Sequence, residues 1–352
     1  MTQKRIKTAI IGYGFSAKTF QIPFITTLPE FELTAISTSK AGEVNIRLPD
    51  VKHYTSATSM IEDTDAELVI ITAPNHVHFE LAKLALESGK HVVIEKPFVT
   101  RIEDGEALIE MAKKRNRVLS IYHNRRWDGD FLTVKKLIEE EMLGDIKHFE
   151  SHYDRFRPQV RQRWREQTTD GGGILFDLGS HLIDQAVELF GVPDYVSAEC
   201  KMRRESSTNV DYFHVILHYP EHLAILHGDM FDAGPNRRFT VKGTLGNYEK
   251  CGFDPQEARL ISGVLPNTLN WSEETQESYG MLYQDEGAET VKTELGAYQD
   301  YFKQLAKSIQ DGLEPPVKPE EALQVIRLIE LAMESSHLGK KLSVIEAKGF
   351  KL

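Results

Sequence analysis

A lysine and a histidine–carboxylate pair are the side chains in this sequence best suited to moving a proton during a reaction. The lysine lies in the stretch HVVIEKPF, where Lys96 comes just after an apolar run. Its ammonium group can hydrogen-bond an oxygen of a bound molecule. If the run is a parallel strand, Lys96 lies at the carboxyl end of that strand, where open α/β sheets bind their ligands. Without such a sheet, a solvated lysine is the commoner interpretation.

The histidine and its carboxylate occur in the stretch GGGILFDLGSHLIDQA. Asp177 and His181 are four residues apart, so they share one face if a helix begins within this stretch. Asp184 falls on the neighbouring part of the same surface. Histidine titrates near neutral pH, and a nearby carboxylate can orient its ring. The pair is a candidate acid–base unit, with a structural histidine as the alternative.

A glycine pattern in the stretch AIIGYGFSAKTF could bind a phosphate group. Gly12, Gly14 and Ala17 stand in G-x-G-x-x-A spacing directly after a short apolar run. Glycines allow the chain to turn sharply and let a pyrophosphate approach bare backbone N–H groups at a helix N-terminus. A tight strand-to-helix turn without a ligand is the alternative.

A fourth stretch, APNHVHF, follows another apolar run. Ala73, Pro74 and Asn75 stand where contacts to a cofactor ribose and nicotinamide would be made. His76 and His78 are two residues apart, so they diverge and do not form a convincing metal-binding pair. For these histidines, a place at a helix start or on the surface is the commoner role.

Alternating strands and helices over the first 122 residues would position these motifs. We expect strands at residues 6–11, 32–36, 67–72, 91–95 and 118–122. Helical patterns cover residues 15–27, 78–87 and 102–114, the last with Thr100 and Glu103 in capping-box spacing. Repeated β-α units with fully apolar strands indicate a parallel sheet covered on both faces. Residues 1–122 are therefore predicted to be a Rossmann-type, doubly wound domain, and the glycine turn to bind a dinucleotide.

The pattern changes after residue 122. A helix near residues 131–141 precedes strand-like segments at 145–153, 195–202, 211–219, 222–231 and 237–242, and helices return at 297–310 and 319–337. Tight turns such as YPEH favour an open, mostly antiparallel sheet in an α+β domain over residues 123–352. We expect this domain to bind the substrate. We also expect the exposed face of its sheet to be buried between subunits of a homo-oligomer, either a dimer or a tetramer.

Composition excludes several functions. The chain has 352 residues, 41% of them hydrophobic, and a formal net charge of −11. That charge argues against a nucleic-acid or anionic-membrane partner. No stretch approaches the roughly 18 apolar residues of a membrane span, and no signal peptide is apparent, which predicts a cytoplasmic protein. Cys200 and Cys251 form no zinc motif, so we expect no metal.

An arginine-rich stretch stands apart from this acidic background. Residues 155–165, RFRPQVRQRWR, hold five arginines. The stretch is either a solvated loop balanced by nearby carboxylates or a site near an anionic cofactor or a subunit contact. The sequence leaves its role open.

Taken together, the motifs resemble the Gfo/Idh/MocA family of nicotinamide-dependent oxidoreductases. GYGFSA, APNHVH, EKPF and GGGILFDLGSHLIDQA occur in the family's order across both domains. SAKTF, HNRRWDGDFLT and FESHYDRFRPQVRQRWREQ are similar to the branch that contains NADPH-dependent scyllo-inositol dehydrogenases. The resemblance implies that the protein moves a hydride between a nicotinamide and a polyol or sugar, such as an inositol.

The resemblance also implies residue roles. Lys96 would bind and polarise the reacting oxygen, His181 would give or take the proton, and Asp177 would orient the substrate or tune His181. The residues expected to bind the cofactor are Gly12, Gly14, Phe15, Ala17, Ser37, Thr38, Ser39, Lys40, Ala73, Pro74, Asn75, His78, Glu95, Lys96, Asn124 and Arg125. Two alternatives stay open, a cofactor-binding regulator without turnover and a nicotinamide-dependent glycoside hydrolase of the same fold.

The end of the second strand predicts the coenzyme. NAD-selective Rossmann domains carry an acid here that binds the ribose 2′-OH and repels a 2′-phosphate. This chain has Ser37, Thr38 and Ser39, followed by Lys40. Hydroxyls and an ammonium suit a phosphate, so we expect NADP(H) to be preferred, with NAD(H) as the second candidate. Glu43 lies a few residues further on, and this preference would be weaker if its carboxylate reached back to the ribose.

Overall fold

The computed structural model describes residues 4–161, 166 and 171–346. By its internal contacts the chain forms two compact units. The first comprises residues 1–124, 256–272 and 297–323, and the second comprises residues 125–255, 273–296 and 324–352. The functional division predicted at residue 122 stays a prediction.

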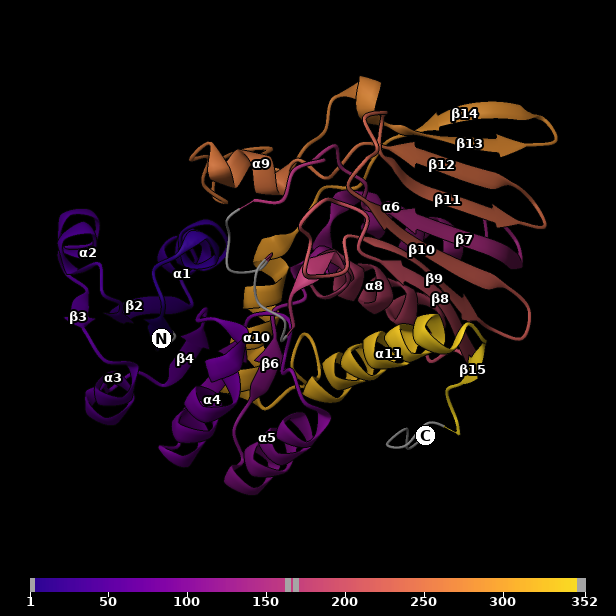
Figure 1. Ribbon diagram of the computed structural model, residues 1–352. Coiled ribbons are helices and arrows are strands. Elements are labelled where there is room, and N and C mark those ends of the chain that lie inside the picture. Colours follow the sequence, from indigo (N-terminus) through magenta and orange to yellow (C-terminus); the bar gives the residue numbers. More distant parts are fainter. Residues whose placement is uncertain (1–3, 162–165, 167–170, 347–352) are drawn as a thin grey trace. The chain divides into compact units, whose positions relative to one another are not determined.

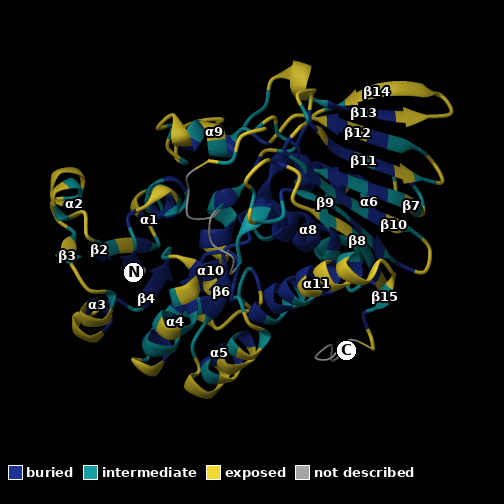
Figure 2. Ribbon diagram, in the orientation of Figure 1, coloured by how far each residue is buried: buried dark blue, intermediate teal, exposed yellow. Residues whose placement is uncertain are grey.

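A six-stranded sheet is the centre of the first unit (Figure 1). Its strands are β1 (Ile6–Ile11), β2 (Phe31–Ser37), β3 (Lys52–Tyr54), β4 (Leu68–Ile71), β5 (His91–Ile94) and β6 (Leu119–Ile121). The order is β3-β2-β1-β4-β5-β6, and every pair is parallel. All four residues of β4 are buried, as its colour in Figure 2 shows. Strands covered on both faces become uniformly apolar, which made this sheet predictable from sequence.

Helices flank this sheet. They are α1 (Ile22–Thr27), α2 (Ala41–Arg47), α3 (Ala57–Asp63), α4 (His78–Glu87), α5 (Ile102–Arg115), α9 (Gln256–Ile261) and α10 (Tyr298–Asp311), with a π-helix, η1, at Ala17–Gln21. The late helix α10 belongs to this unit because Phe302 stacks on Phe24 of α1, with ring centroids 5.0 Å apart. The aromatic side chains of α10 thus complete the core of a unit whose first strand is β1.

Two local expectations were wrong or incomplete. The predicted capping box of α5 does not form, since the helix begins after Arg101 and has no side-chain cap. The short strand β3 was not predicted, because none of its three residues is buried and it has no apolar pattern to find.

His91 is a point of pH sensitivity at the start of β5. Its Nδ1 accepts a hydrogen bond of 3.0 Å from the backbone N–H of Val118, so that nitrogen must carry no proton. Burial, with a smaller effect of the Arg117 charge, lowers the pKa of His91 to about 4. An unfolded chain protonates this ring near pH 6.5. The contribution of His91 to the free energy of unfolding is therefore fully present above pH 6.5, and it is lost as the pH falls toward 4.

A His91→Asn variant will lose less stability in acid than the parent protein. The amide oxygen of asparagine can accept the same hydrogen bond but does not titrate. We expect the decrease in Tm between pH 7 and pH 5 to be smaller in the variant, measured by thermal unfolding in matched buffers. Equal decreases in both proteins would contradict this account of His91.

A nine-stranded mixed sheet forms the second unit. Its strands are β7 (Ile146–His152), β8 (Tyr195–Lys201), β9 (Tyr212–His218), β10 (Leu223–Asp229), β11 (Arg237–Gly243), β12 (Asn247–Cys251), β13 (Gly280–Gln284), β14 (Gly287–Val291) and β15 (Leu342–Ser343). The order is β14-β13-β12-β11-β7-β10-β9-β8-β15. Only β7 and β10 pair in parallel among these neighbours. The predicted mostly antiparallel sheet is confirmed.

Helices cover one face of this sheet (Figure 1). They are α6 (Gly129–Glu139), α8 (Ser180–Phe190) and α11 (Pro319–Leu338), and their apolar side chains share one core with the inward residues of the strands. Alternate residues of β7, β9 and β10 are only half-buried and lie on the other face. This alternation is typical of a sheet with a single covered face. Among the described residues, no helix is long and apolar enough to cross a membrane.

Candidate active site

The predicted cofactor motifs meet at one edge of the six-stranded sheet. Each follows or ends a parallel strand, so each lies at the carboxyl edge of the sheet: Gly12 after β1, Ser37 at the end of β2, Asn75 after β4, Lys96 after β5 and Asn124 after β6. The strand order reverses direction between β1 and β4. In open α/β sheets, ligands bind outside the carboxyl ends at such a reversal.

The two glycines after β1 have different reasons to be glycine. Gly12 has a φ of +100°, and a Cβ there would lie 2.5 Å from Thr72 Oγ1. Its N–H donates a 2.8 Å hydrogen bond to the carbonyl of Ser37, so the fold itself requires this residue. A Cβ on Gly14 would meet no atom within 4 Å. Packing therefore leaves space above Gly14, as close approach of a pyrophosphate requires.

Glu95 ties the glycine turn to the end of β5. Its Oε1 accepts hydrogen bonds from Ser16 Oγ and, at 3.1 Å, from Gln21 Nε2. The carboxylate is buried. Glu95 therefore holds the two loops at the sheet edge together, and its direct contact with a cofactor stays a prediction. Phe15 is 56% exposed on the same turn, whereas Ala17 is fully buried.

His78 fixes the loop that carries Lys96. Its Nε2 lies 2.9 Å from the carbonyl oxygen of Ala73, and its Nδ1 lies 3.1 Å from that of Pro97. The buried ring thus links the loop after β4 to the loop after β5. Lys96 itself is only 8% exposed, and the Lys96–Pro97 peptide bond is cis. The sequence motif predicts His78 as a cofactor contact and gives no sign of this positioning role.

Hydroxyl groups and a lysine follow β2, where coenzyme selectivity is set in this fold. Ser37 is buried, whereas Ser39 and Lys40 are exposed. The Thr38 hydroxyl accepts a hydrogen bond of 3.2 Å from the N–H of Lys40. These residues form a polar turn with a positive charge at its end.

Glu43, the acid next along the chain from this turn, is paired with a lysine. Its carboxylate forms an ion pair with the ammonium of Lys18. The hydrogen bond from Lys18 lowers the pKa of the Glu43 carboxyl. The negative charge of Glu43 is therefore matched by a cation within the protein.

In the second unit, Asp177 and His181 lie on consecutive helical segments. Asp177 belongs to a π-helix, η4 (Leu175–Gly179), and His181 is the second residue of α8. His181 is 5% exposed, and Asp177 is half-buried. Short π-helical turns are frequent at functional sites. The helix expected within this stretch is confirmed, although its first turn is wider than an α-helix.

Asp184 has a structural partner. The guanidinium of Arg126 donates to both of its carboxylate oxygens, at 2.7 and 2.9 Å, and also to Glu188 at 2.9 Å. Gln185 adds a hydrogen bond of 2.7 Å from its Nε2 to the carbonyl of Arg125. These buried contacts fix α8, and with it the position of His181.

Arg125, predicted to bind the cofactor, is described, and so is part of the arginine-rich stretch whose role the sequence leaves open. Arg125 is 7% exposed. Its guanidinium carbon lies 5.0 Å from the ring centroid of Tyr153, and its Nη1 donates a 3.3 Å hydrogen bond to Asp128 Oδ2. Arg155 lies over the same ring at 4.9 Å. Arg157 and Arg161 are also described, whereas Arg163 and Arg165 lie outside the described residues. Lys96 belongs to the first unit and Asp177 and His181 to the second, so their joint action is part of the proposal below.

Comparison with known proteins places both halves of the chain in one family. The profile of the oxidoreductase family, NAD-binding Rossmann fold, matches residues 6–123, and that of the oxidoreductase family, C-terminal alpha/beta domain, matches residues 135–344. Over 335 residues the chain is 43% identical to the uncharacterized oxidoreductase YdgJ of Escherichia coli. This alignment covers 94% of this chain and 96% of that protein.

A second relative and a solved structure also cover nearly the whole chain. It is 41% identical to scyllo-inositol 2-dehydrogenase (NADP(+)) IolW of Bacillus subtilis, over 94% of both proteins. The solved structure of yvaA from Bacillus subtilis has a TM-score of 0.93 at 40% identity and spans 97% of this chain and 99% of that chain. On these matches, the chain belongs to the Gfo/Idh/MocA family of oxidoreductases, and its residues 6–123 form the NAD-binding Rossmann domain of that family.

Proposed function

We propose that this protein is an NADP(H)-dependent oxidoreductase that moves a hydride between the nicotinamide and a carbinol or carbonyl carbon of a polyol or sugar, such as an inositol. The observation that carries the proposal is the buried Lys96 at the carboxyl edge of a sheet whose first turn leaves open space at Gly14. The similarity to a scyllo-inositol 2-dehydrogenase supports the substrate class.

Residues at the sheet edge would hold the coenzyme. They are Gly12, Gly14, Phe15 and Ala17 on the first turn, Ser37 at the end of β2 with Thr38, Ser39 and Lys40 after it, Ala73, Pro74, Asn75 and His78 after β4, Glu95 and Lys96 after β5, and Asn124 and Arg125 after β6. Backbone N–H groups at the first turn would bind the pyrophosphate. The bound coenzyme supplies the hydride chemistry.

Lys96, His181 and Asp177 would manage the substrate. The Lys96 ammonium donates a hydrogen bond to the reacting oxygen and stabilises negative charge on it. His181 accepts the hydroxyl proton when the carbinol is oxidised and returns it in the reverse direction. Asp177 orients the substrate or the His181 ring. Burial of Lys96 and His181 strengthens both interactions, because little water competes with them.

The turn after β2 supports a preference for NADP(H). Ser37, Ser39 and Lys40 offer hydroxyl donors and an ammonium to a 2′-phosphate. The ion pair with Lys18 offsets the negative charge of Glu43, which follows this turn in sequence and would otherwise repel the phosphate. NAD(H) remains the second candidate.

We also propose a homodimer or homotetramer in the cytoplasm. The half-buried outward face of the nine-stranded sheet supports self-association, because single-faced sheets bury that surface in symmetric assemblies. The formal net charge of −11 supports a small-molecule partner over nucleic acid.

The experiment that tests this function is a spectrophotometric panel of inositols, aldoses and ketoses, run with NADP+ and NAD+ or with their reduced forms. We expect NADPH to accumulate in step with oxidation of one polyol or sugar. A glycoside hydrolase that recycles its nicotinamide would give no net NADPH with this panel and would release a hydrolysis product from an added glycoside. A regulator would bind NADPH and turn over neither the panel nor the glycoside. Either outcome would overturn the proposal.

A further inference from the structure

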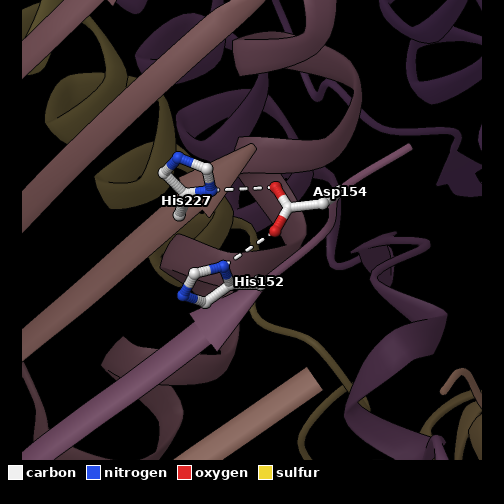
Figure 3. A group of neighbouring side chains, drawn as sticks. All are labelled: His152, Asp154 and His227. Atoms are coloured by element: carbon white, nitrogen blue, oxygen red, sulfur yellow. Dashed lines mark hydrogen bonds and ion pairs between the residues drawn. The ribbon is translucent and has the colours of Figure 1, made fainter. Parts of the chain in front are cut away.

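Two histidines and an aspartate gather on the outward face of the nine-stranded sheet, near the end of β7 (Figure 3). His152 is the last residue of β7, and His227 lies beside it on β10, where the two residues are register partners. Asp154 follows β7 by two residues and points between the two rings. The parallel pairing of β7 and β10 brings His227 next to His152 and within hydrogen-bond distance of Asp154, which precedes His227 by 73 positions.

Each of the two histidines directs its Nδ1 at a different carboxylate oxygen of Asp154. Nδ1 of His152 lies 2.8 Å from one carboxylate oxygen of Asp154, and Nδ1 of His227 lies 2.8 Å from the other. All three ligand atoms lie within 4.8 Å of one another. Around a metal ion with bonds of about 2.0–2.1 Å, neighbouring ligand atoms stand about 3 Å apart, so small movements of the rings would admit the ion.

Asp154 is held firmly in this position. Its carboxylate is buried and accepts a 2.9 Å hydrogen bond from the backbone N–H of Asp229. Its own N–H donates to the side-chain oxygen of Asn236 at 2.8 Å. These backbone contacts fix the carboxylate independently of the histidines, which is the preorganisation that a ligand needs.

A second carboxylate orients one of the rings. Nε2 of His152 lies 2.6 Å from Glu150 Oε1, which leaves Nδ1 of that ring directed at Asp154. The other oxygen of Glu150, Oε2, lies 3.1 Å from Nε2 of His148. Metal-binding histidines commonly donate their second ring N–H to a carboxylate, so Glu150 stands where an outer-sphere partner belongs.

We propose that His152, Asp154 and His227 form a binding site for one divalent first-row metal ion, with Zn2+ as the ion best suited to it. Two imidazole nitrogens favour Zn2+ over Mg2+ or Ca2+, which prefer oxygen ligands. On binding, the two hydrogen bonds to Asp154 are replaced by two N–metal bonds and one O–metal bond. Any proton on either Nδ1 leaves to solvent, no electron is transferred, and water fills the remaining coordination positions.

The three ligands are different residues from those given a role in the chemistry proposed above. They lie on β7, on β10 and just after β7, whereas Asp177 and His181 lie on η4 and α8. An ion here would clamp β7 to β10, the one parallel pair among the named strand pairs of this sheet. Its expected effect is therefore on stability.

Metal-free protein without an affinity tag, titrated with ZnCl2 by calorimetry in the absence of coenzyme and substrate, tests the proposal. We expect one Zn2+ per chain and a rise in Tm when Zn2+ is added, because an ion that binds only the folded state stabilises it. Co2+ in place of Zn2+ should give the visible absorption of a site with nitrogen ligands. Titration that shows no stoichiometric Zn2+ would overturn the proposal.

Variants identify the ligands. Asp154→Asn and His227→Gln should each weaken Zn2+ binding by at least about 10-fold, since each removes one ligand. His214→Gln is the matched control, because His214 pairs with His227 from β9 but is not one of the three ligands. Cys251→Ser excludes binding by the exposed thiol.

Either control variant is expected to bind Zn2+ as the parent does. Unchanged binding in both ligand variants, or an equal loss in His214→Gln or Cys251→Ser, would show that the ligands are assigned wrongly. Circular dichroism confirms that each variant is folded, and His227→Gln, at a half-buried position, keeps the test available if Asp154→Asn does not fold.

Discussion

Lys96→Met and His181→Asn variants will each lose about 100-fold or more in kcat and still bind NADPH. The methionine keeps the buried stem of Lys96 but cannot donate a hydrogen bond to the reacting oxygen. The asparagine removes the proton acceptor at position 181, and acid–base groups of this kind commonly contribute 100-fold or more. Steady-state kinetics on the best polyol substrate give kcat, and NADPH fluorescence titration gives coenzyme affinity.

A matched control is His76→Ala. His76 lies on the same sheet edge but is exposed, and the proposal gives it no role. We expect its kcat to stay within about twofold of the parent. If Lys96→Met and His181→Asn also kept near-parental kcat, the assigned roles of these residues would be wrong.

A Ser37→Asp variant will change coenzyme selectivity by about 10-fold or more toward NAD(H). The carboxylate would accept hydrogen bonds from a ribose 2′-OH and repel a 2′-phosphate. The measurement is the ratio of kcat/KM for NADP+ to that for NAD+ with one substrate. Ser37→Ala removes the hydroxyl without adding charge, so its ratio should change much less.

Ser37 is buried, and an aspartate there could lower stability. Ser39→Asp puts the same charge on an exposed residue two positions along and keeps the test available. Lys40→Ala should lower the ratio as well, because it removes an ammonium from the phosphate. A parent enzyme that favours NAD+, or a ratio unmoved by either aspartate, would contradict the proposed ribose site.

The parallel sheet was predictable from sequence because burial on both faces leaves a uniform apolar signal. The strands expected at residues 6–11 and 91–95 correspond to β1 and β5, and the helix expected at 78–87 corresponds to α4. The antiparallel strands β12 to β14 were not predicted. Residues 287–291 of β14, for instance, are mostly exposed, so they lack the alternation that identifies a strand.

The contacts that position the candidate site could not be read from sequence spacing. Glu95 joins two loops through Ser16, 79 positions away, and Arg126 holds Asp184 from 58 positions away. The π-helical turn before α8 is also invisible to an α-helical pattern. Sequence motifs identified which residues have suitable chemistry, but only tertiary pairing determined which of them have a structural role.

The same limit explains the histidine cluster. The sequence predicted no metal because it contains no closely spaced ligand motif. His152 and Asp154 are two apart on and after one strand, and His227 comes from its parallel neighbour. Strand pairing brings the two histidines together, and the segment just after β7 adds Asp154.

Transfer of deuterium tests the central claim most directly. A polyol substrate carrying deuterium on the carbinol carbon is oxidised with NADP+, and the coenzyme product is examined by mass spectrometry and NMR. The proposed reaction predicts one deuterium at C4 of the nicotinamide for each carbonyl product formed, because the hydride moves directly between the two carbons. NADPH without deuterium, or a transformed substrate with no net NADPH, would contradict it.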